Sequence, residues 1–293
     1  MYNFLYDIYN YDDRQINQLI LEMYQSVFHI DMKDEFKWRF LDNPKGRAIG
    51  VVVFQDNNLV GHTSLMPCEV NIRDKREDAV ISMGTMIHSD YAGQKIGTSM
   101  IQLLHQHLSE SKYSLLMGFP NDNSFTMFTT RLGWTHIRDY HFTSFPNKGQ
   151  KHKNHYELAD INFVCLNAER IEAGICLSRD QEYLNWRYND NRYEIFRSEE
   201  KCFVITKFQE KYDIVYWSPN VKEEDIRDFA QFIYDTFKVS TVSTWDSFPF
   251  SDKDVVRGQR GYHFCARKLK NDLTDDILIA NEWTWLMGDS ELF

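Results

Sequence analysis

An internal repeat constrains the fold of this chain more than any other feature of its sequence. Residues 38–44 are W-R-F-L-D-N-P and residues 186–192 are W-R-Y-N-D-N-R, with the same residue type at the W, R, D and N positions. Each copy is followed by a strand, turn, strand pattern, at residues 50–65 and at residues 201–217. Repetition of a whole supersecondary pattern indicates that one structural unit occurs twice.

A third match closes both halves of the chain. RLGWTHIRDYHF at residues 131–142 is similar to QRGYHFCARKL at residues 259–269, and all three matches keep the same order. The polar segment NKGQKHKNH lies between the halves and is typical of a linker. We therefore predict two α/β units, at residues 1–146 and 157–293, joined by a linker at residues 147–156.

Composition excludes several classes of protein. The net charge of -10 argues against a nonspecific nucleic-acid binder. No apolar run approaches the ~18 residues of a membrane span, and the first residues lack a secretion signal, so we expect a cytoplasmic protein without membrane contact. The five cysteines are scattered and never form a C-x-x-C pair, which argues against disulfides and zinc and predicts reduced, buried thiols.

Hydrophobic periodicity predicts the elements of the first half. The expected helices cover residues 12–28, 34–41, 93–109 and 124–132, and the expected strands cover residues 50–55, 59–66, 78–88, 113–119 and 135–142. The helix after residue 93 is the clearest, because Ile96, Met100, Leu104 and Leu108 recur on one face. The second half repeats the order, but carboxylate-rich SPNVKEED precedes its corresponding helix.

The turn before that clear helix carries the chemistry. HSDYAGQKIGTSM, residues 88–100, places Gly93 and Gly97 between a strand and a helix. Backbone N–H groups and the positive end of the helix dipole at such a turn favour a pyrophosphate, and glycine lets the backbone approach its oxygens. Neither a P-loop nor a G-x-G-x-x-G motif is present. An ordinary tight turn at a helix start is the alternative.

Residues 86–108, MIHSDYAGQKIGTSMIQLLHQHL, resemble the acyl-CoA loop of the GCN5-related N-acetyltransferase (GNAT) superfamily, V-H-P-x-Y-R-G-x-G-I-G. LLMGFPNDNSF and RLGW resemble two later segments of that family. The resemblance covers residues 50–142, and the second half resembles a degenerate GNAT unit. It implies an α/β (α+β) fold of two tandem GNAT-like units, each a mixed, mostly antiparallel sheet flanked by helices.

The resemblance also implies acyl-CoA as co-substrate and no metal. The strand end at Met86, Ile87 and His88 would offer backbone groups to the pantetheine arm, and the N–H near Ile87 would polarise the thioester carbonyl. Gly84 and Gly118 would let the two central strands separate. The complete set predicted to hold the cofactor is Met86, Ile87, His88, Ala92, Gly93, Gln94, Lys95, Ile96, Gly97, Thr98, Asn121, Asn123 and Phe128.

This chain departs from the family pattern at three points. Ala92 replaces the usual Arg or Gln and Lys95 replaces a glycine, so Lys95 would supply positive charge to the phosphates. The tyrosine that the family often uses as general acid falls at Phe128 or Thr129, which leaves water as the acid. No titrating residue occupies the usual base positions on the long strand.

Catalytic and acceptor residues are assigned with their alternatives. Asn121 would contact the acyl carbonyl, and His62 is the candidate base because imidazole titrates near neutral pH; the alternative for His62 is a structural histidine. Phe119, Trp245 and Asp246 are the candidate acceptor residues, whereas the aromatic residues of STWDSFPF are otherwise core residues.

The predicted function is an N-acyltransferase that moves an acetyl or short hydroxyacyl group, such as 3-hydroxybutyryl, from acyl-CoA to an amine. The resemblance to tandem-GNAT enzymes and the 44 aromatic residues favour a dTDP- or UDP-linked amino-deoxysugar of surface polysaccharide biosynthesis as acceptor. An aminoacyl-tRNA-dependent transferase and a catalytically silent acyl-CoA binding protein remain open, as does a monomer or a homodimer.

Overall fold

The computed structural model describes residues 3–166, 174–248, 250–251 and 255–290. The chain forms two compact units: unit 1 comprises Met1–Arg138 and His263–Ala280, and unit 2 comprises Asp139–Tyr262 and Asn281–Phe293. Strands β6 (Thr135–Phe145) and β13 (Val256–Lys268) and the 3-10 turn η5 (Ala280–Glu282) contribute residues to both units. The division therefore does not fall at residues 147–156, and independent folding of residues 1–146 and 157–293 stays a prediction.

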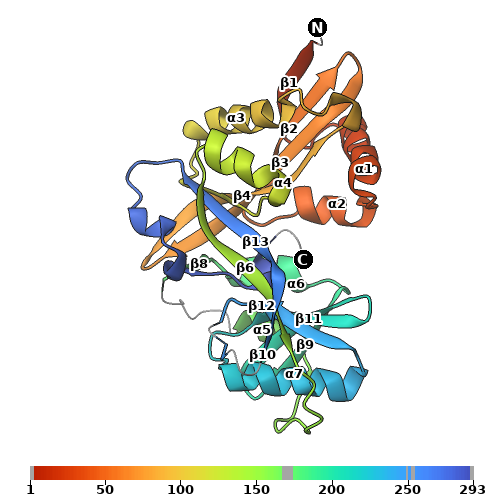
Figure 1. Cartoon of the computed structure of the whole chain (residues 1–293), viewed down its shortest axis with the longest axis vertical. Coiled ribbons are helices and arrows are strands. Elements are labelled where there is room, and N and C mark those ends of the chain that lie inside the picture. The colour runs from red at the N-terminus through yellow and green to blue at the C-terminus, as the bar shows by residue number, and fades with distance from the viewer. Residues whose placement is uncertain (1–2, 167–173, 249, 252–254, 291–293) are drawn as a thin grey trace. The chain divides into compact units, whose positions relative to one another are not determined.

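Unit 1 is a mixed sheet with helices on both faces (Figure 1). Its strands lie in the order β1-β2-β3-β4-β5-β13, antiparallel except for the parallel pair β4 and β5. The elements are β1 (Phe4–Tyr9), α1 (Arg14–Phe28), α2 (Lys33–Phe40), β2 (Ile49–Gln55), β3 (Asn58–Ile72), β4 (Lys75–Ile87), η1 (Ser89–Tyr91), α3 (Ile96–Ser109), β5 (Leu115–Gly118), α4 (Asp122–Thr126), the π-helical turn η2 (Met127–Arg131) and η4 (Asp275–Leu278).

The two faces of the unit 1 sheet bury different kinds of side chain. Helices α3 and α4 lie on one face and α1 and α2 on the other (Figure 1). Met100 and Leu104 of α3 pack with Val51 and Leu116 in an apolar core. The α1/α2 face is aromatic, with Tyr11 stacked on Phe40 at 4.7 Å between ring centroids. The apolar stripe predicted for α3 thus faces the sheet, as periodicity requires.

Unit 2 repeats this architecture. Its strands lie in the order β6-β12-β11-β10-β9-β7, antiparallel except for the parallel pair β11 and β12. The short strands β8 and β14 pair with each other in parallel. The elements are β7 (Glu157–Leu158), α5 (Ile161–Leu166), β8 (Ile175–Leu177), α6 (Gln181–Tyr188), β9 (Tyr193–Ser198), β10 (Lys201–Phe208), β11 (Lys211–Trp217), α7 (Glu223–Phe237), β12 (Thr241–Trp245), β14 (Trp283–Thr284) and η6 (Met287–Asp289).

The repeat inferred from the W-R segments corresponds to repeated structure. Each segment begins on a helix, α2 in unit 1 and α6 in unit 2. The order α2-β2-β3-β4-α3-β5 recurs as α6-β9-β10-β11-α7-β12, and the parallel pair β4/β5 corresponds to β11/β12. The predicted fold class, tandem α/β units with mixed sheets and flanking helices, is confirmed.

Two further expectations concern the whole chain. None of the helices in the described part is both long enough and apolar enough to cross a membrane. Cys68, Cys176, Cys202 and Cys265 are buried free thiols, whereas the side chain of Cys165 lies outside the described residues.

Candidate active site

Strands β4 and β5 separate at one end of the unit 1 sheet. Their parallel pairing runs from Ala79 opposite Leu115 to Ser82 opposite Gly118, where β5 ends. Strand β4 continues to Ile87 while still paired with β3 on its other side. The last residues of β4, Met86 and Ile87 among them, therefore present an edge that β5 does not cover.

Gly84 shapes this open edge of β4. Its φ is +42°, and a Cβ at this position would lie 2.2 Å from Tyr24 Oη. The pairing between β3 and β4 shifts register between His62 and Ser64, close to Gly84. A bulge of this kind bends a strand and favours glycine. Gly84 is therefore required both by the backbone conformation and by the close approach of a tyrosine.

The turn after β4 exposes an uncapped helix start. Lys95 is the N-cap of α3 and has φ +62°, in the left-handed region where the family pattern has glycine. No side chain caps α3 in the described structure, and its first turn carries no acidic residue. Ala92, Gly93, Gln94 and Lys95 are exposed, whereas Ile96 and Gly97 are buried against the sheet. Free N–H groups and the helix dipole at this exposed turn suit a pyrophosphate.

These two features together fit acyl-CoA. Its pyrophosphate would lie at the turn formed by residues 92–98, and its pantetheine arm would lie along Met86, Ile87 and His88. Gly97 approaches the strand so closely that a Cβ there would lie 3.2 Å from Ile87 Cδ1. Bound acyl-CoA would supply an activated thioester, and the protein would supply position and N–H donors.

His62 lies on the α1/α2 face of the sheet and is completely buried. Its Nε2 is 3.0 Å from Tyr11 Oη, and its Nδ1 has no hydrogen-bond partner in the described structure. Burial lowers the pKa of His62 to about 3, because the charged imidazolium loses its solvation. His62 is therefore neutral at pH 7, and a proton from a substrate would have to reach it through a neighbour such as the Tyr11 hydroxyl. Its role as base stays a prediction.

The residues after β5 are arranged around α4. Asn121 caps that helix, since its Oδ1 accepts the Ser124 N–H at 3.0 Å, while Asn123 is exposed. Phe128 is buried and meets Trp134 edge-on at 4.8 Å between ring centroids. A cofactor contact by Phe128 would therefore involve a ring that belongs to the core. The Thr129 hydroxyl donates to the Phe125 carbonyl at 2.9 Å.

The three predicted acceptor residues differ in accessibility. Trp245 has no exposed surface and stacks on Tyr140 at 5.3 Å between ring centroids, so contact with a substrate would require the core of unit 2 to open. The Asp246 carboxylate accepts the His141 N–H at 2.8 Å and is 9% exposed. Phe119, by contrast, is half-buried beside Phe264 in unit 1.

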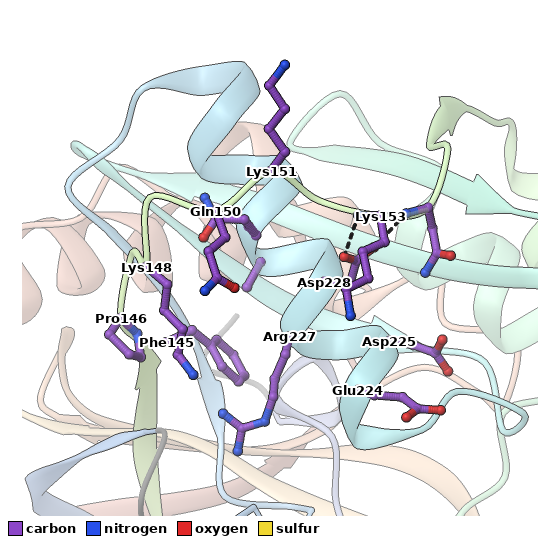
Figure 2. Close-up of a pocket in the computed structure, with 13 residues that line it drawn as sticks. Phe145, Pro146, Lys148, Gln150, Lys151, Lys153, Glu224, Asp225, Arg227 and Asp228 are labelled. Carbon is purple, nitrogen blue, oxygen red and sulfur yellow. Dashed lines mark hydrogen bonds between the residues drawn. The ribbon is translucent and has the colours of Figure 1, made fainter.

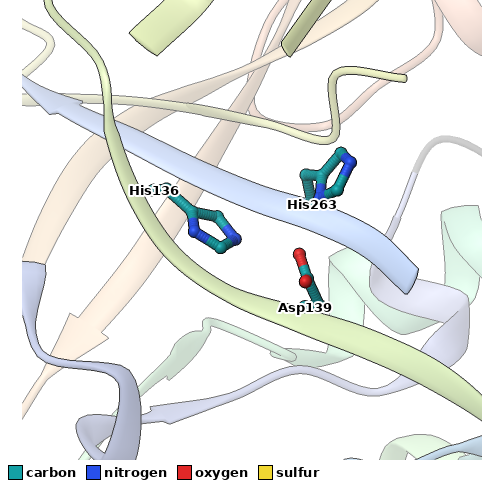
Figure 3. Close-up of side chains that lie close together, drawn as sticks. All are labelled: His136, Asp139 and His263. Carbon is teal, nitrogen blue, oxygen red and sulfur yellow. The ribbon is translucent and has the colours of Figure 1, made fainter. Parts of the chain in front are cut away.

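A histidine–aspartate pair in unit 1 was missed by the sequence reasoning. His263 Nε2 lies 3.0 Å from Asp122 Oδ1, although the two residues are 141 positions apart. His136 lies near His263, with 5.8 Å between ring centroids (Figure 3). The signal in the sequence was the third match, whose Y-H-F segment contains His141 in one half and His263 in the other.

A separate cavity of about 440 Å³ lies in unit 2, between the segment after β6 and the first turns of α7 (Figure 2). Asp228 on its wall accepts the N–H groups of Lys153 and Asn154, at 2.7 and 2.9 Å, and the Tyr156 hydroxyl at 3.0 Å. The predicted linker is thus fastened to α7 within unit 2. The cavity contains none of the residues predicted to hold acyl-CoA.

A family model matches part of the chain. Residues 10–137 match the family model described as an acetyltransferase (GNAT) domain. The matched residues make up less than half of the chain and lie within unit 1, and acetyl-CoA is the co-substrate of that family. No curated protein matches the chain.

Solved structures share the fold over most of the chain. A conserved protein of Enterococcus faecalis V583, described as a probable N-acyltransferase, superposes with a TM-score of 0.68 at 12% identity, covering 92% of this chain and 73% of that one. A GCN5-related N-acetyltransferase from Anabaena variabilis gives 0.66 at 12% identity, with 91% and 73% covered. One from Kribbella flavida gives 0.64 at 11% identity, with 90% and 71% covered.

Proposed function

We propose that the chain is an acyl-CoA-dependent N-acyltransferase whose acceptor is the primary amine of a dTDP- or UDP-linked amino-deoxysugar. The observation that carries the acyl-CoA part is the open edge of β4 beside the uncapped, glycine-containing start of α3. The acceptor part is supported by the resemblance to tandem-GNAT sugar acyltransferases and by Phe119, a half-buried aromatic ring at the end of β5.

The reaction is aminolysis of a thioester. The amine nitrogen attacks the thioester carbonyl, the new N–C bond forms, and the C–S bond breaks as sulfur takes the electron pair. The N–H near Ile87 stabilises negative charge on the carbonyl oxygen. A thiolate with a pKa near ~8.5 is a tolerable leaving group, so its protonation by water is sufficient. His62, the base predicted from the sequence, would have to act through Tyr11 because it is completely buried.

Release of free thiol from acetyl-CoA and 3-hydroxybutyryl-CoA tests this function. The acceptors are dTDP- and UDP-linked amino-deoxysugars, and the matched controls are the same sugars with hydroxyl in place of amine. We expect thiol release with at least one amino sugar and none with its hydroxyl control. No amine-dependent release across the panel would refute the proposal.

A silent acyl-CoA binding protein is the second candidate. It is favoured by Phe128, which is buried, and by Thr129, whose hydroxyl is bound to a backbone carbonyl, because neither side chain acts as a phenolic acid. Calorimetry separates the two functions. Tight binding of CoA without turnover on any amine would favour the silent protein.

A further inference from the structure

The His263–Asp122 pair lies at the end of unit 1 where β4 and β5 separate. Strand β13 pairs antiparallel with β5, and the last paired residues are Cys265 and Gly118. Gly118 is also the last residue of β5 that pairs with β4. His263 precedes Cys265 by two residues on β13, so it stands beyond the end of β5. Asp122 begins α4, four residues after Gly118.

The geometry of the pair suits proton transfer. The 3.0 Å contact between His263 Nε2 and Asp122 Oδ1 lets a carboxylate orient the imidazole and stabilise its protonated form. Phe125 packs against the His263 ring at 4.3 Å between centroids and restrains it. The side chains of His263 and Asp122 are 20% and 72% exposed, so both are accessible to solutes.

Three other histidines of unit 1, His62, His105 and His88, are less suited to this task. His62 is completely buried, and its pKa is lowered to about 3. His105 accepts the Trp134 Nε1–H at 3.1 Å, and burial lowers its pKa to about 4. His88 Nδ1 lies 3.8 Å from the nearest oxygen of Asp90, beyond hydrogen-bond distance. His263 combines accessibility with a carboxylate at hydrogen-bond distance.

Unit 2 contains a second histidine–aspartate pair. His141 stands in the matching Y-H-F segment, and Asp246 follows β12 as Asp122 follows β5. His141 Nδ1 is 3.6 Å from Asp246 Oδ2, and Asp246 accepts the His141 backbone N–H instead. The pair with a side-chain hydrogen bond and an exposed carboxylate therefore occurs in the unit that also has the glycine-containing helix start.

We propose that His263, oriented by Asp122, is the base of the acyl-transfer reaction; this inference rests on the proposed N-acyltransferase function. As the N–C bond forms and the C–S bond breaks, the proton leaves the attacking nitrogen for the His263 imidazole. Sulfur keeps the electron pair of the broken bond. The imidazolium then returns its proton to the thiolate or to solvent, and the neutral imidazole is restored.

This role predicts an acid limb in the pH profile of kcat/KM. An imidazolium cannot accept a proton, so the rate falls as pH drops through the titration of His263. The groups around His263 are Asp122 from α4 and His136 from β6, with Asp139 three residues further along that strand. Asp122→Asn removes the stabilising carboxylate and should move the acid limb to lower pH.

The test compares His263→Gln and Asp122→Asn with His141→Gln, the matched variant from unit 2, in the thiol-release assay. We expect His263→Gln to lower kcat by about 10²-fold or more and to remove the imidazole from the acid limb, which then reflects only the acceptor ammonium, with CoA affinity unchanged by calorimetry. His141→Gln should keep the wild-type pH profile. Thermal unfolding checks each variant, and Asp122→Asn, altered at an exposed carboxylate, supplies the test if His263→Gln does not fold.

The outcomes separate this inference from the proposed function. Amine-dependent thiol release by the wild type establishes the function whatever the variants do. Given that activity, a His263→Gln enzyme with the same acid limb as the wild type and a near-wild-type kcat overturns the role of His263. A wild type without turnover refutes the function, and the base assignment with it.

Discussion

The two units share an order of elements but differ at the start of their central helix. In unit 1, α3 begins at Lys95 with no side-chain cap and no acidic residue in its first turn. In unit 2, α7 begins with Glu223, Glu224 and Asp225, and Asp225 accepts the Lys222 N–H at 2.9 Å. Carboxylates at a helix start stabilise the helix and repel a phosphate. The same fold therefore has a helix start that suits an anion in one unit and a helix start that disfavours an anion in the other.

The repeated W-R segment differs between the units as well. In unit 2, Arg187 is 3% exposed and donates to the carbonyls of Gly288 and Ser290 at 2.7 and 3.0 Å. In unit 1, the equivalent Arg39 is partly exposed and lies 3.5 Å from Glu35. One copy of the arginine thus holds the C-terminal segment, and the other pairs along its own helix.

Substitution of Arg187 has the largest expected effect on the free energy of unfolding, and it tests the difference between the two arginines. Arg187→Ala leaves two buried carbonyls without their charged donor and should lower the free energy of unfolding by about 3–5 kcal/mol. Arg39→Ala, the matched variant, should cost about 1 kcal/mol. Urea denaturation measures both. Equal costs would mean that the two copies of the segment contribute alike.

Substitution of Gly84 has the next largest expected effect on stability. It also tests the comparison of the two units, because β4 contains this glycine and the equivalent strand β11 contains none. Gly84→Ala combines a strained φ with a Cβ against Tyr24 Oη, so it should cost about 3 kcal/mol. Gly149→Ala is the control: its φ is +63°, but no atom lies within 4 Å of the new Cβ. That control should cost about 1 kcal/mol. A similar loss for both variants would show that the contact with Tyr24 is unimportant.

Acid should lower the stability of unit 1 because of the buried His62 in β3. The equivalent strand of unit 2, β10, contains no histidine. The pKa of His62 is about 3 in the fold and 6.5 when unperturbed, so between these values the unfolded chain binds a proton that the native chain does not. Stability therefore falls as pH drops below 6.5, by up to about 1.4 kcal/mol per pH unit. Burial of His105, with its pKa of about 4, adds to this.

The measurement is urea denaturation at pH 7 and pH 5. His62→Gln should reduce the loss of stability between these two conditions, whereas His107→Gln, at an exposed position of α3, should leave it unchanged. Hydrogen exchange should show the acid-induced loss of protection in β3 more than in β10. An unchanged pH dependence in His62→Gln would mean that another group dominates.

The secondary-structure elements that the sequence predicted well are those specified by short-range hydrophobic patterns. The apolar spacing of α3 and the strand, turn, strand pattern of β2 and β3 depend on neighbours in the chain, so these elements were predicted. Helix α3 begins at Ile96 rather than at residue 93, and β3 continues to Ile72 rather than ending at residue 66. Strand β1 was missed, because its short run of alternating residues gives a weak signal beside the charged residues that follow. Strand β4 begins at Lys75, before its apolar stretch, since it continues as a hairpin with β3.

The contact between His263 and Asp122, which the sequence did not predict, depends on pairing between strands that are far apart in the chain. His263 meets Asp122 because β13 pairs with β5, and no local pattern specifies which strand lies beside β5. Burial also changes what a residue type implies: His62 in the core has a pKa far from that of a free imidazole. Trp245 was a plausible stacking residue by type, yet it has no exposed surface. Accessibility, unlike residue type, is a property of the whole fold.

Lys95 gives the smallest effect and the closest test of the contrast between the two helix starts. Its φ of +62° places it in a conformation that glycine adopts without strain, so charge and backbone conformation can be separated at this position. Lys95→Gly removes the charge and relieves the strain, whereas Lys95→Ala removes the charge alone.

If the Lys95 ammonium contacts the pyrophosphate, both variants should weaken CoA binding by about 1–2 kcal/mol, as for a charge-assisted hydrogen bond. Lys95→Gly should be the more stable of the two to denaturation by about 1 kcal/mol. Calorimetry with CoA and with CoA lacking its 3′-phosphate locates the contact, because loss of a pyrophosphate contact weakens both ligands equally. Unchanged affinity in both variants would leave the backbone N–H groups of α3 as the source of phosphate binding in unit 1.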